Sequence, residues 1–342
     1  MNFTDIDVAS RRKKPKKAIF FEKMETVTPI GRWVELIRPH YHVKGNGREP
    51  IDLEIMVRMY LLSQWENYSD DKCEDVLCYD PLARAFCKIT ADPPDASTLG
   101  KFRNLLEKHD LCKKIFEEEV KILKKNQIML QQGTGVDATV IAAPESRKNK
   151  SGKSNPEFST SLKNRRSCFG IKAHIGVDMK SGLVHSVATT AAGESDLANA
   201  HKCLHGSETS VRADSGYIGI EKRLEVCQMF DAGTGEMEVT WSKKGRNGKL
   251  AKVLVPKKKD GIKFIVNKKQ SQIKERKQKY VEQQKARKRW KVENAFLILK
   301  HIFGFRKTRL GTIHKNENKC YMMFTLVNCY MCSQRGLSTK TA

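Results

Sequence analysis

The sequence is short of negative charge. Its 39 aspartate and glutamate residues stand against 64 lysine and arginine residues, so 342 residues carry a formal net charge of +25. Such an excess favours a polyanionic partner, because phosphates that are neutralised by Lys and Arg release their counterions. No stretch of the sequence is long and apolar enough to span a bilayer, which excludes a membrane-spanning protein and favours nucleic acid as the polyanion.

The sequence also lacks an export signal and a complete zinc motif. Its first residues do not follow the basic-then-apolar order of a signal peptide, so we expect the ten cysteines to be reduced thiols. Cys329 and Cys332 form a CxxC pair, but no second pair completes a tetrahedral zinc site. His201 and His205 stand four residues apart without further ligands of matching spacing. These absences argue against a disulfide-stapled secreted protein and against a zinc protein.

Three carboxylates are the most informative residues that are present. Asp137 lies within a β-branched run, residues 135–141, which predicts a strand. Asp214 closes residues 210–214 just before a Ser-Gly-Tyr turn, and Glu293 lies in an apolar-periodic stretch that predicts a helix. Hard divalent ions need carboxylate oxygens, and two Mg²⁺ ions can activate one oxygen and stabilise another at a phosphodiester. Single acids in such positions are most often turn caps or surface residues, so the hypothesis of a two-metal site rests on the combination.

The period of the hydrophobic pattern changes along the chain and predicts three parts. Residues 1–50 are expected to be an irregular basic segment, and residues 51–131 a helical, helix-turn-helix-like DNA-binding domain. From residue 132 to residue 342 we predict a catalytic α/β domain, with basic insertions at 145–167 and 243–285. The chain is long enough for two domains.

Within the helical part, Asp95 is placed to cap a helix that follows a Pro-Pro break. A polar turn followed by a helix with an exposed basic face is how a helix-turn-helix offers its second helix to the major groove. An ordinary amphipathic helix with Lys on its wet side explains the pattern equally well. The residues predicted to face inward are Leu99, Phe102 and Leu106, and those predicted to face DNA are Lys101, Arg103 and Lys108.

After residue 133 the predicted order is three strands, a helix, a strand, a helix, a strand and the long helix that carries Glu293. That order is the one of a ribonuclease-H-like fold, an α/β layer architecture. In such a fold the acid of the first strand and the acid of the fourth strand lie side by side. The late helix packs its carboxylate against them, as the positions of Asp137, Asp214 and Glu293 require.

Two basic segments interrupt this pattern. The first insertion contributes Lys163, Arg165 and Arg166. Residues 257–291 hold 15 Lys and Arg against three acids and lead directly into the Glu293 helix. A charge run is usually a solvated face, but this one is placed to meet DNA phosphates near the predicted metal site. The cations predicted to contact DNA there are Lys285, Arg287 and Lys288.

With these motifs in hand the chain resembles bacterial insertion-sequence transposases of the DDE type, closest to the group conventionally numbered five. The resemblance runs from about residue 51 to residue 337. The stretches that carry it are Val136-Asp137-Ala138-Thr139, the Phe169–Asp178 run, Gly182-Leu183-Val184-His185-Ser186, Ala213-Asp214-Ser215-Gly216-Tyr217 and Val292-Glu293-x-x-Phe296 with Phe303-Gly304-Phe305.

The resemblance implies that Asp137, Asp214 and Glu293 bind two Mg²⁺ ions, with Mn²⁺ as an alternative, and that Arg289 and Lys300 assist them. At 3.6 residues per turn these two cations share the helix face of Glu293. The resemblance also implies a homodimer that binds double-stranded element ends and target DNA. It would cut and join DNA by cut-and-paste transposition in the bacterial cytoplasm, at the nucleoid. Two alternatives stay open: a nuclease of the same fold without strand transfer, and an inactive or domesticated DNA-binding copy.

Other acids flank the predicted strands and have simpler roles. Asp178 stands at a hairpin turn, where Asp is favoured because it accepts hydrogen bonds from the backbone. Glu194 and Asp196 precede a helix and are interpreted as N-terminal helix acids.

Overall fold

The computed structural model describes residues 13–41, 49–145, 154–163, 166–243, 250–273 and 275–337. These residues form two compact units, which are described separately. Unit 1 takes in the described residues up to Asn126, Ile298–Phe305 and those from Tyr321 onward. Unit 2 takes in Gln127–Leu297 and Arg306–Cys320.

Unit 1 is helical. Its helices are α2 (Lys16–Val27), α3 (Ile30–Ile37), the short 3₁₀ helix η1 (Arg38–His40), α4 (Leu53–Trp65), α5 (Asp70–Tyr79), α6 (Pro81–Cys87), α7 (Ala96–Lys108), α8 (Leu111–Lys125) and the π-helical η6 (Ile298–Ile302). Much of α4 is buried, which fits a central helix in a helical bundle.

Two helices occupy a segment that the sequence predicted to be irregular. The structure places α2 and α3 between residues 16 and 37, and the prediction for this part of the segment was wrong. The reason is tertiary: α2 has few regularly spaced apolar residues, but Phe21, Met24 and Val27 are buried against the bundle. Long aromatic and apolar side chains stabilise a helix through packing even where its own periodicity is weak.

The helix α7 follows its sequence prediction closely. The Asp95 carboxylate accepts a hydrogen bond from the backbone N–H of Thr98 at 2.6 Å, which caps the helix. Leu99, Phe102 and Leu106 are buried, as predicted.

Unit 2 is built on a mixed sheet. Its strands are β1 (Gly133–Ala142), β2 (Ser159–Lys163), β3 (Arg166–Asp178), β4 (Val184–Ala191), β5 (Ser210–Ala213), β6 (Met237–Lys243), β7 (Leu250–Pro256) and β8 (Lys263–Val266). Its helices are α9 (Asp196–Asn199), η2 (Ala200–Cys203), η3 (Ser215–Tyr217), η4 (Ile220–Lys222), α10 (Leu224–Met229), η5 (Gln270–Gln272) and α11 (Arg276–Leu297). The helix α12 (Ile313–Gln334) begins in unit 2 and ends in unit 1.

The sheet runs in the order β2-β3-β1-β5-β8, and β4 also pairs with β3. The pairs β2–β3, β1–β3 and β3–β4 are antiparallel, whereas the pairs β1–β5 and β5–β8 are parallel. The strand predicted around residues 237–241 exists, but it belongs to a separate two-stranded hairpin with β7. The sheet is instead continued by β8, which lies inside the predicted basic insertion at 243–285.

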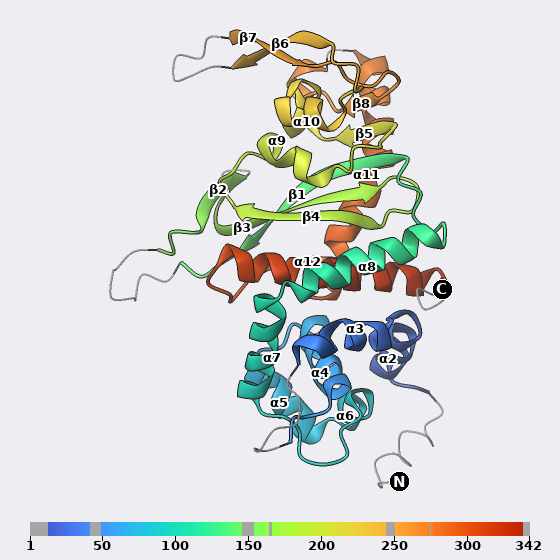
Figure 1. The fold of residues 1–342 in the computed structure, drawn as a ribbon, viewed down its shortest axis with the longest axis vertical. Coiled ribbons are helices and arrows are strands. Elements are labelled where there is room, and N and C mark those ends of the chain that lie inside the picture. Colours follow the sequence, from blue (N-terminus) through green and yellow to red (C-terminus); the bar gives the residue numbers. More distant parts are fainter. Residues whose placement is uncertain are drawn as a thin grey trace. The chain divides into compact units, whose positions relative to one another are not determined.

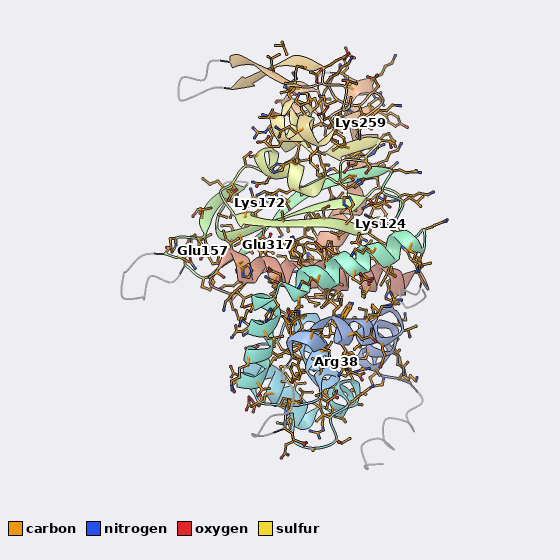
Figure 2. The ribbon with its side chains drawn as sticks, viewed as in Figure 1. Arg38, Lys124, Glu157, Lys172, Lys259 and Glu317 are labelled. Atoms are coloured by element: carbon orange, nitrogen blue, oxygen red, sulfur yellow. The ribbon has the colours of Figure 1, made fainter. Side chains whose placement is uncertain are left out.

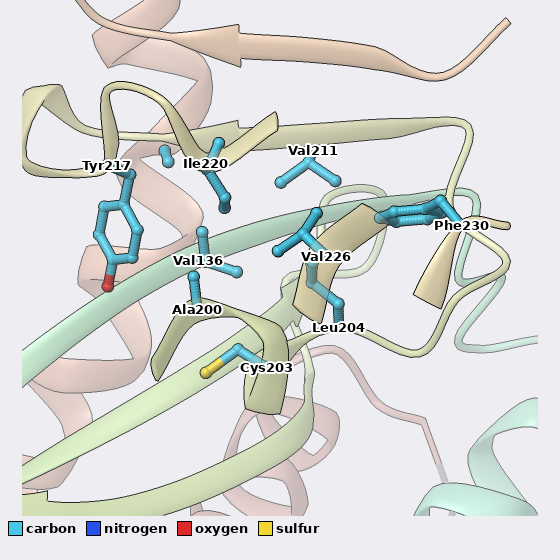
Figure 3. Packing of buried hydrophobic residues seen from close by; sticks show 10 residues of the cluster. Val136, Ala200, Cys203, Leu204, Val211, Tyr217, Ile220, Val226 and Phe230 are labelled. Atoms are coloured by element: carbon cyan, nitrogen blue, oxygen red, sulfur yellow. The ribbon is translucent and has the colours of Figure 1, made fainter. Parts of the chain in front are cut away.

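One face of the sheet is covered by the short helices that follow β4 and β5. Val136 of β1 lies in an apolar cluster with Ala200 and Cys203 of η2, Tyr217 of η3 and Val226 of α10 (Figure 3). Because side chains alternate along a strand, Val136 on this face sends its neighbours Gly135 and Asp137 to the other face.

The long helix α11 packs on that other face, against β1 (Figure 1). Its first two-thirds are polar and largely exposed, and Val292 and Ala295 anchor its end in the core. The start of α12 is held by Glu157, whose carboxylate accepts a hydrogen bond from the N–H of Ile313 at 2.7 Å (Glu157 is labelled in Figure 2).

Candidate active site

The close packing of α11 on β1 depends on Gly135. A Cβ atom at this position would lie 2.6 Å from Val292 Cγ2 and 2.6 Å from Met179 Sδ, so only glycine lets the helix approach this far. Gly135 is two residues before Asp137 on the same face of the strand. The approach at Gly135 therefore brings the side chains of α11 to Asp137.

Arg289 of α11 joins two of the predicted acids. Its Nη1 donates a hydrogen bond to Asp137 Oδ2 at 2.8 Å, and its Nη2 donates to Glu293 Oε1 at 2.9 Å. The pairing with Glu293 follows from their spacing of four residues on one helix. The side chains of Arg289 and Asp137 are only 15% and 18% exposed, whereas that of Glu293 is 58% exposed. One guanidinium thus holds a strand acid and a helix acid at the opening of the site.

Asp214 stands at the end of β5, beside β1. The parallel pairing matches Gly133 with Ser210 and Gly135 with Arg212, and Asp137 and Asp214 each lie two residues beyond this last matched pair. One Asp214 oxygen, Oδ1, accepts a hydrogen bond from the N–H of Gly216 at 2.8 Å and caps the turn. The turn thus fixes the carboxylate at the strand end.

Tyr217 responds to both aspartates. Burial raises the pKa of its phenol, and the negative charges of Asp137, Asp196 and Asp214 raise that pKa further.

The donor set suits a hard divalent cation, but the acids are not arranged as a finished metal site. Among the described residues, no three His, Cys, Asp or Glu side chains are grouped closely enough to hold an ion. The guanidinium of Arg289 is hydrogen-bonded to both Asp137 and Glu293. The guanidinium is a positive charge bound by both Asp137 and Glu293. The two carboxylates could therefore bind a divalent cation if Arg289 no longer contacted them.

Two family models match this chain. The model described as "Transposase DDE domain" matches residues 129–329, and the model described as "Transposase domain (DUF772)" matches residues 8–105. This chain belongs to the transposase DDE-domain family. A solved structure of a piggyBac transposase synaptic complex with hairpin DNA is 12% identical, over 96% of this chain and 78% of that chain, with a TM-score of 0.34.

Membership of the family makes this transposase a nucleic-acid-processing enzyme that acts on DNA, and divalent metal ions are general in the family. Asp137, Asp214, Glu293, Arg289 and Lys300 all fall within the matched DDE domain. Among the residues that the structure describes, no helix is long and apolar enough to cross a membrane.

The predicted helper Lys300 lies in a different setting from Arg289. It belongs to η6, a π-helical segment, and to unit 1. The expectation that Lys300 shares the face of Glu293 assumed an unbroken α-helix, and the wider π turn changes that angular offset. Its role as a helper stays a prediction.

The predicted DNA-binding cations of α11 differ in their contacts. Lys285 is tied to its own unit, because its Nζ lies 2.7 Å from Glu282 Oε1 and 3.5 Å from the carbonyl oxygen of Val266. Arg287 and Lys288 are exposed. The structure thus leaves Arg287 and Lys288 as the more accessible pair on this helix.

The predicted DNA-binding cations of α7 also differ in their contacts. Lys101 and Lys108 are exposed, whereas the guanidinium of Arg103 makes two hydrogen bonds with the carboxylate of Asp70 at 2.7 and 2.8 Å. Arg103 therefore holds α7 to α5.

The predicted DNA-binding cations of the first insertion cannot be compared in this way. Arg165 lies outside the described residues. Lys163 ends β2 and Arg166 begins β3, and their side chains also lie outside what the structure describes.

The other acids that flank the strands have structural roles. Asp178 accepts hydrogen bonds from Ser181 N and Ser181 Oγ at 2.7 and 2.6 Å, so its prediction as a turn cap is confirmed. Asp196 is the first residue of α9 and pairs with Lys172 at 2.8 Å. Glu194 accepts a hydrogen bond from Asn199.

Sequence reasoning missed two residues that position the site. Lys291 donates hydrogen bonds to the carbonyl oxygens of Met179 and Lys180, at 3.0 and 2.7 Å, and so fastens α11 to the β3–β4 turn. Gly135 admits the helix to the strand. Lys291 is one of many cations in a basic run, so the sequence does not distinguish it from lysines that face solvent. A single glycine before a strand acid forms no recognisable motif.

Proposed function

We propose that this chain is the transposase of a bacterial insertion sequence of group five, with a ribonuclease-H-like catalytic domain. It would bind the ends of its element, cut them and join them to target DNA by a cut-and-paste route. The observation that carries the proposal is that Arg289 pairs with both Asp137 of β1 and Glu293 of α11, while Asp214 follows β5, the strand that pairs in parallel with β1. The order of the mixed sheet supports the ribonuclease-H-like assignment.

Asp137, Asp214 and Glu293 would hold two Mg²⁺ ions, or Mn²⁺ in their place. When bound, such ions lower the cost of generating an attacking oxygen and stabilise the leaving oxygen of a phosphodiester. The protein contributes the placement of the acids: Gly216 fixes Asp214 at the turn, and Lys291 fixes the helix that carries Glu293. No covalent intermediate is needed, so no nucleophilic Ser or Tyr is proposed.

The remaining cations would position DNA. Arg287 and Lys288 lie on the helix of Arg289 and Glu293 and are exposed, so they can neutralise phosphates beside the acids. Lys101 and Lys108 on α7 would contact the element end as the second helix of a helix-turn-helix does. Two ends must be handled together, so we expect a homodimer acting at the bacterial nucleoid.

The test is a strand-transfer assay. Inverted repeats that flank the coding region supply the end sequence, and an oligonucleotide with this sequence and a free 3′-hydroxyl is mixed with a supercoiled plasmid and Mg²⁺. We expect oligonucleotide joined to plasmid, and none with the Asp137→Asn variant. Cleavage without joined product would favour the nuclease of the same fold, and specific binding without cleavage would favour an inactive copy.

A further inference from the structure

The guanidinium of Arg289 occupies the place between two acids that the proposed function assigns to metal. It is bound to Asp137 at 2.8 Å and to Glu293 at 2.9 Å. The Nε atom of the same side chain is buried and has no hydrogen-bond partner among the described residues. Two of its three nitrogens are thus committed to the acids, and the third has no protein partner there.

The electrostatics explain why the contact forms. Two carboxylates brought together by the packing of α11 on β1 repel each other, and a cation between them relieves that repulsion. Arginine is always charged, and its planar fork matches two carboxylates at once. A shielded position strengthens such pairs relative to exposed ones, and the Arg289 side chain is only 15% exposed.

The helix itself is held independently of this contact. Lys291 fastens α11 to the β3–β4 turn, and Val292 packs against β1 at Gly135. Loss of the Arg289 contacts therefore does not require α11 to move, because rotation of one long side chain is enough.

We propose that Arg289 is the resident counter-cation of the acidic site and that a divalent metal must displace its guanidinium to bind. The proposal rests on the proposed function, since it assumes that Asp137 and Glu293 are metal ligands. The displaced guanidinium becomes available to a DNA phosphate, which it can bind through two parallel hydrogen bonds. DNA that draws Arg289 away thereby helps metal to enter, and metal that displaces Arg289 helps DNA to bind.

Metal binding without DNA tests the exchange and needs no cleavage. Mn²⁺ affinity is measured by the loss of the free-ion electron paramagnetic resonance signal, for the wild type, Arg289→Gln, Arg289→Lys and Arg276→Gln. The last variant removes the same charge from an exposed position of the same helix. Melting temperatures with and without Mn²⁺ are recorded for each protein, and circular dichroism verifies that each variant is folded.

We expect Arg289→Gln to bind Mn²⁺ about tenfold more tightly than the wild type, and a tenfold change corresponds to about 1.4 kcal/mol. Its melting temperature should fall without metal and rise more when Mn²⁺ is added. Arg289→Lys should lie between the two, because an ammonium cannot bridge both acids as a fork does. Arg276→Gln should match the wild type.

A second arm adds a DNA end in which a phosphorothioate blocks cleavage. In the wild type, DNA should raise the affinity for Mn²⁺. In Arg289→Gln, DNA should raise the affinity less, and the difference should be about the factor by which the substitution alone raised it. The exchange would be overturned if Arg289→Gln bound Mn²⁺ no more tightly than the wild type. If Asp137→Asn abolished Mn²⁺ binding in the same series, the metal site itself would still stand. Absence of Mn²⁺ binding in every protein, with and without DNA, would instead overturn the proposed function.

Discussion

Arg289 and Asp137 are separated by 152 residues in the sequence and joined by a hydrogen bond of 2.8 Å. The contact links the helix α11 to the middle of β1, and it ties the first of the three predicted acids to the segment that carries the last. It is possible only because Gly135 lets α11 lie close to the strand. The catalytic site that we propose for this transposase therefore depends on the packing of α11 against β1 at Gly135.

The first prediction concerns the three acids. Asp137→Asn, Asp214→Asn and Glu293→Gln should each slow Mg²⁺-dependent cleavage by at least about a hundredfold, since even the loss of an outer-shell partner of a metal ligand costs 10–100-fold. DNA binding should stay largely intact, because the basic surface is unchanged. Single-turnover cleavage and a filter-binding assay measure the two effects, and Asp260→Asn controls for the loss of one exposed acid. Cleavage at a near wild-type rate by one of the three variants would remove that residue from the site.

The second prediction concerns the close approach at Gly135. Gly135→Ala should cost about 1–3 kcal/mol of stability, because its Cβ would crowd Val292 and Met179. Gly135→Ala should also slow cleavage, because the crowding moves α11 away from β1. The double variant Gly135→Ala/Val292→Ala should recover part of the cleavage rate, because the smaller side chain lets α11 lie closer to β1.

Urea denaturation and cleavage rates measure both effects of the crowding. Gly31→Ala in α3 is the matched control, because an added Cβ there meets nothing within 4 Å. If Gly135→Ala matched the wild type in both assays, the fit of α11 on β1 would be looser than we describe.

The third prediction separates the cations of α11 by their contacts. Arg287→Ala and Lys288→Ala should each reduce the slope of log K against log salt by about 0.9, if each side chain neutralises one phosphate. Lys285→Ala should change the slope much less, because Lys285 is engaged by Glu282. Fluorescence anisotropy with labelled DNA at a series of salt concentrations gives the slopes. Equal slopes for all three variants and the wild type would mean that this part of the helix is a solvated face.

The fourth prediction concerns two cations of α7 with different roles. Arg103→Ala should destabilise unit 1 by about 1–2 kcal/mol, because it breaks a partly exposed, two-bonded pair with Asp70. Lys101→Ala should leave stability unchanged and weaken DNA binding. Thermal denaturation and DNA titration distinguish the two variants, and Asp70→Ala should reproduce the loss of stability. A DNA-binding defect in Arg103→Ala at full stability would return Arg103 to the DNA-contacting set.

The fifth prediction is a pH dependence that comes from Glu119 of α8. This side chain is fully buried, and burial raises the pKa of its carboxyl to about 8, against a lowering by its hydrogen bond with Cys329 and by Arg32. The folded state therefore keeps a proton that the unfolded state loses above its ordinary pKa of 4.5. The stability of the wild type should fall as the pH rises from about 4.5 towards 8.

Glu119→Gln should lose this dependence. Since one pKa unit corresponds to about 1.4 kcal/mol, the variant should gain on the order of 2–3 kcal/mol over the wild type between pH 5 and pH 7. The free energy of unfolding is measured across that range, with Glu117→Gln on the exposed face of α8 as the control. A constant difference between Glu119→Gln and the wild type at all pH values would show that Glu119 ionises normally.

The sequence by itself determined the local elements of this transposase and the identity of its acids. Side-chain chemistry within one turn or one strand is a local matter, so Asp95 could be recognised as a helix cap and Asp178 as a turn cap. Alternation and spacing likewise placed Asp137 on a strand and Glu293 on a helix. The arginine four residues before Glu293 could be expected to share its face, because helix geometry fixes that spacing.

Tertiary structure alone decided which distant residues meet. Arg289 pairs with Asp137, Lys285 and Lys291 bind the carbonyl oxygens of Val266 and Met179, and Asp70 binds Arg103; each contact joins residues from separate elements. The same is true of β8, which continues the sheet in place of the predicted strand, and of α2, which is stabilised by packing in spite of its weak pattern. A charge run in the sequence shows how many cations are present, but whether a cation faces DNA or an acid of its own chain depends on burial and on the neighbours that the fold supplies.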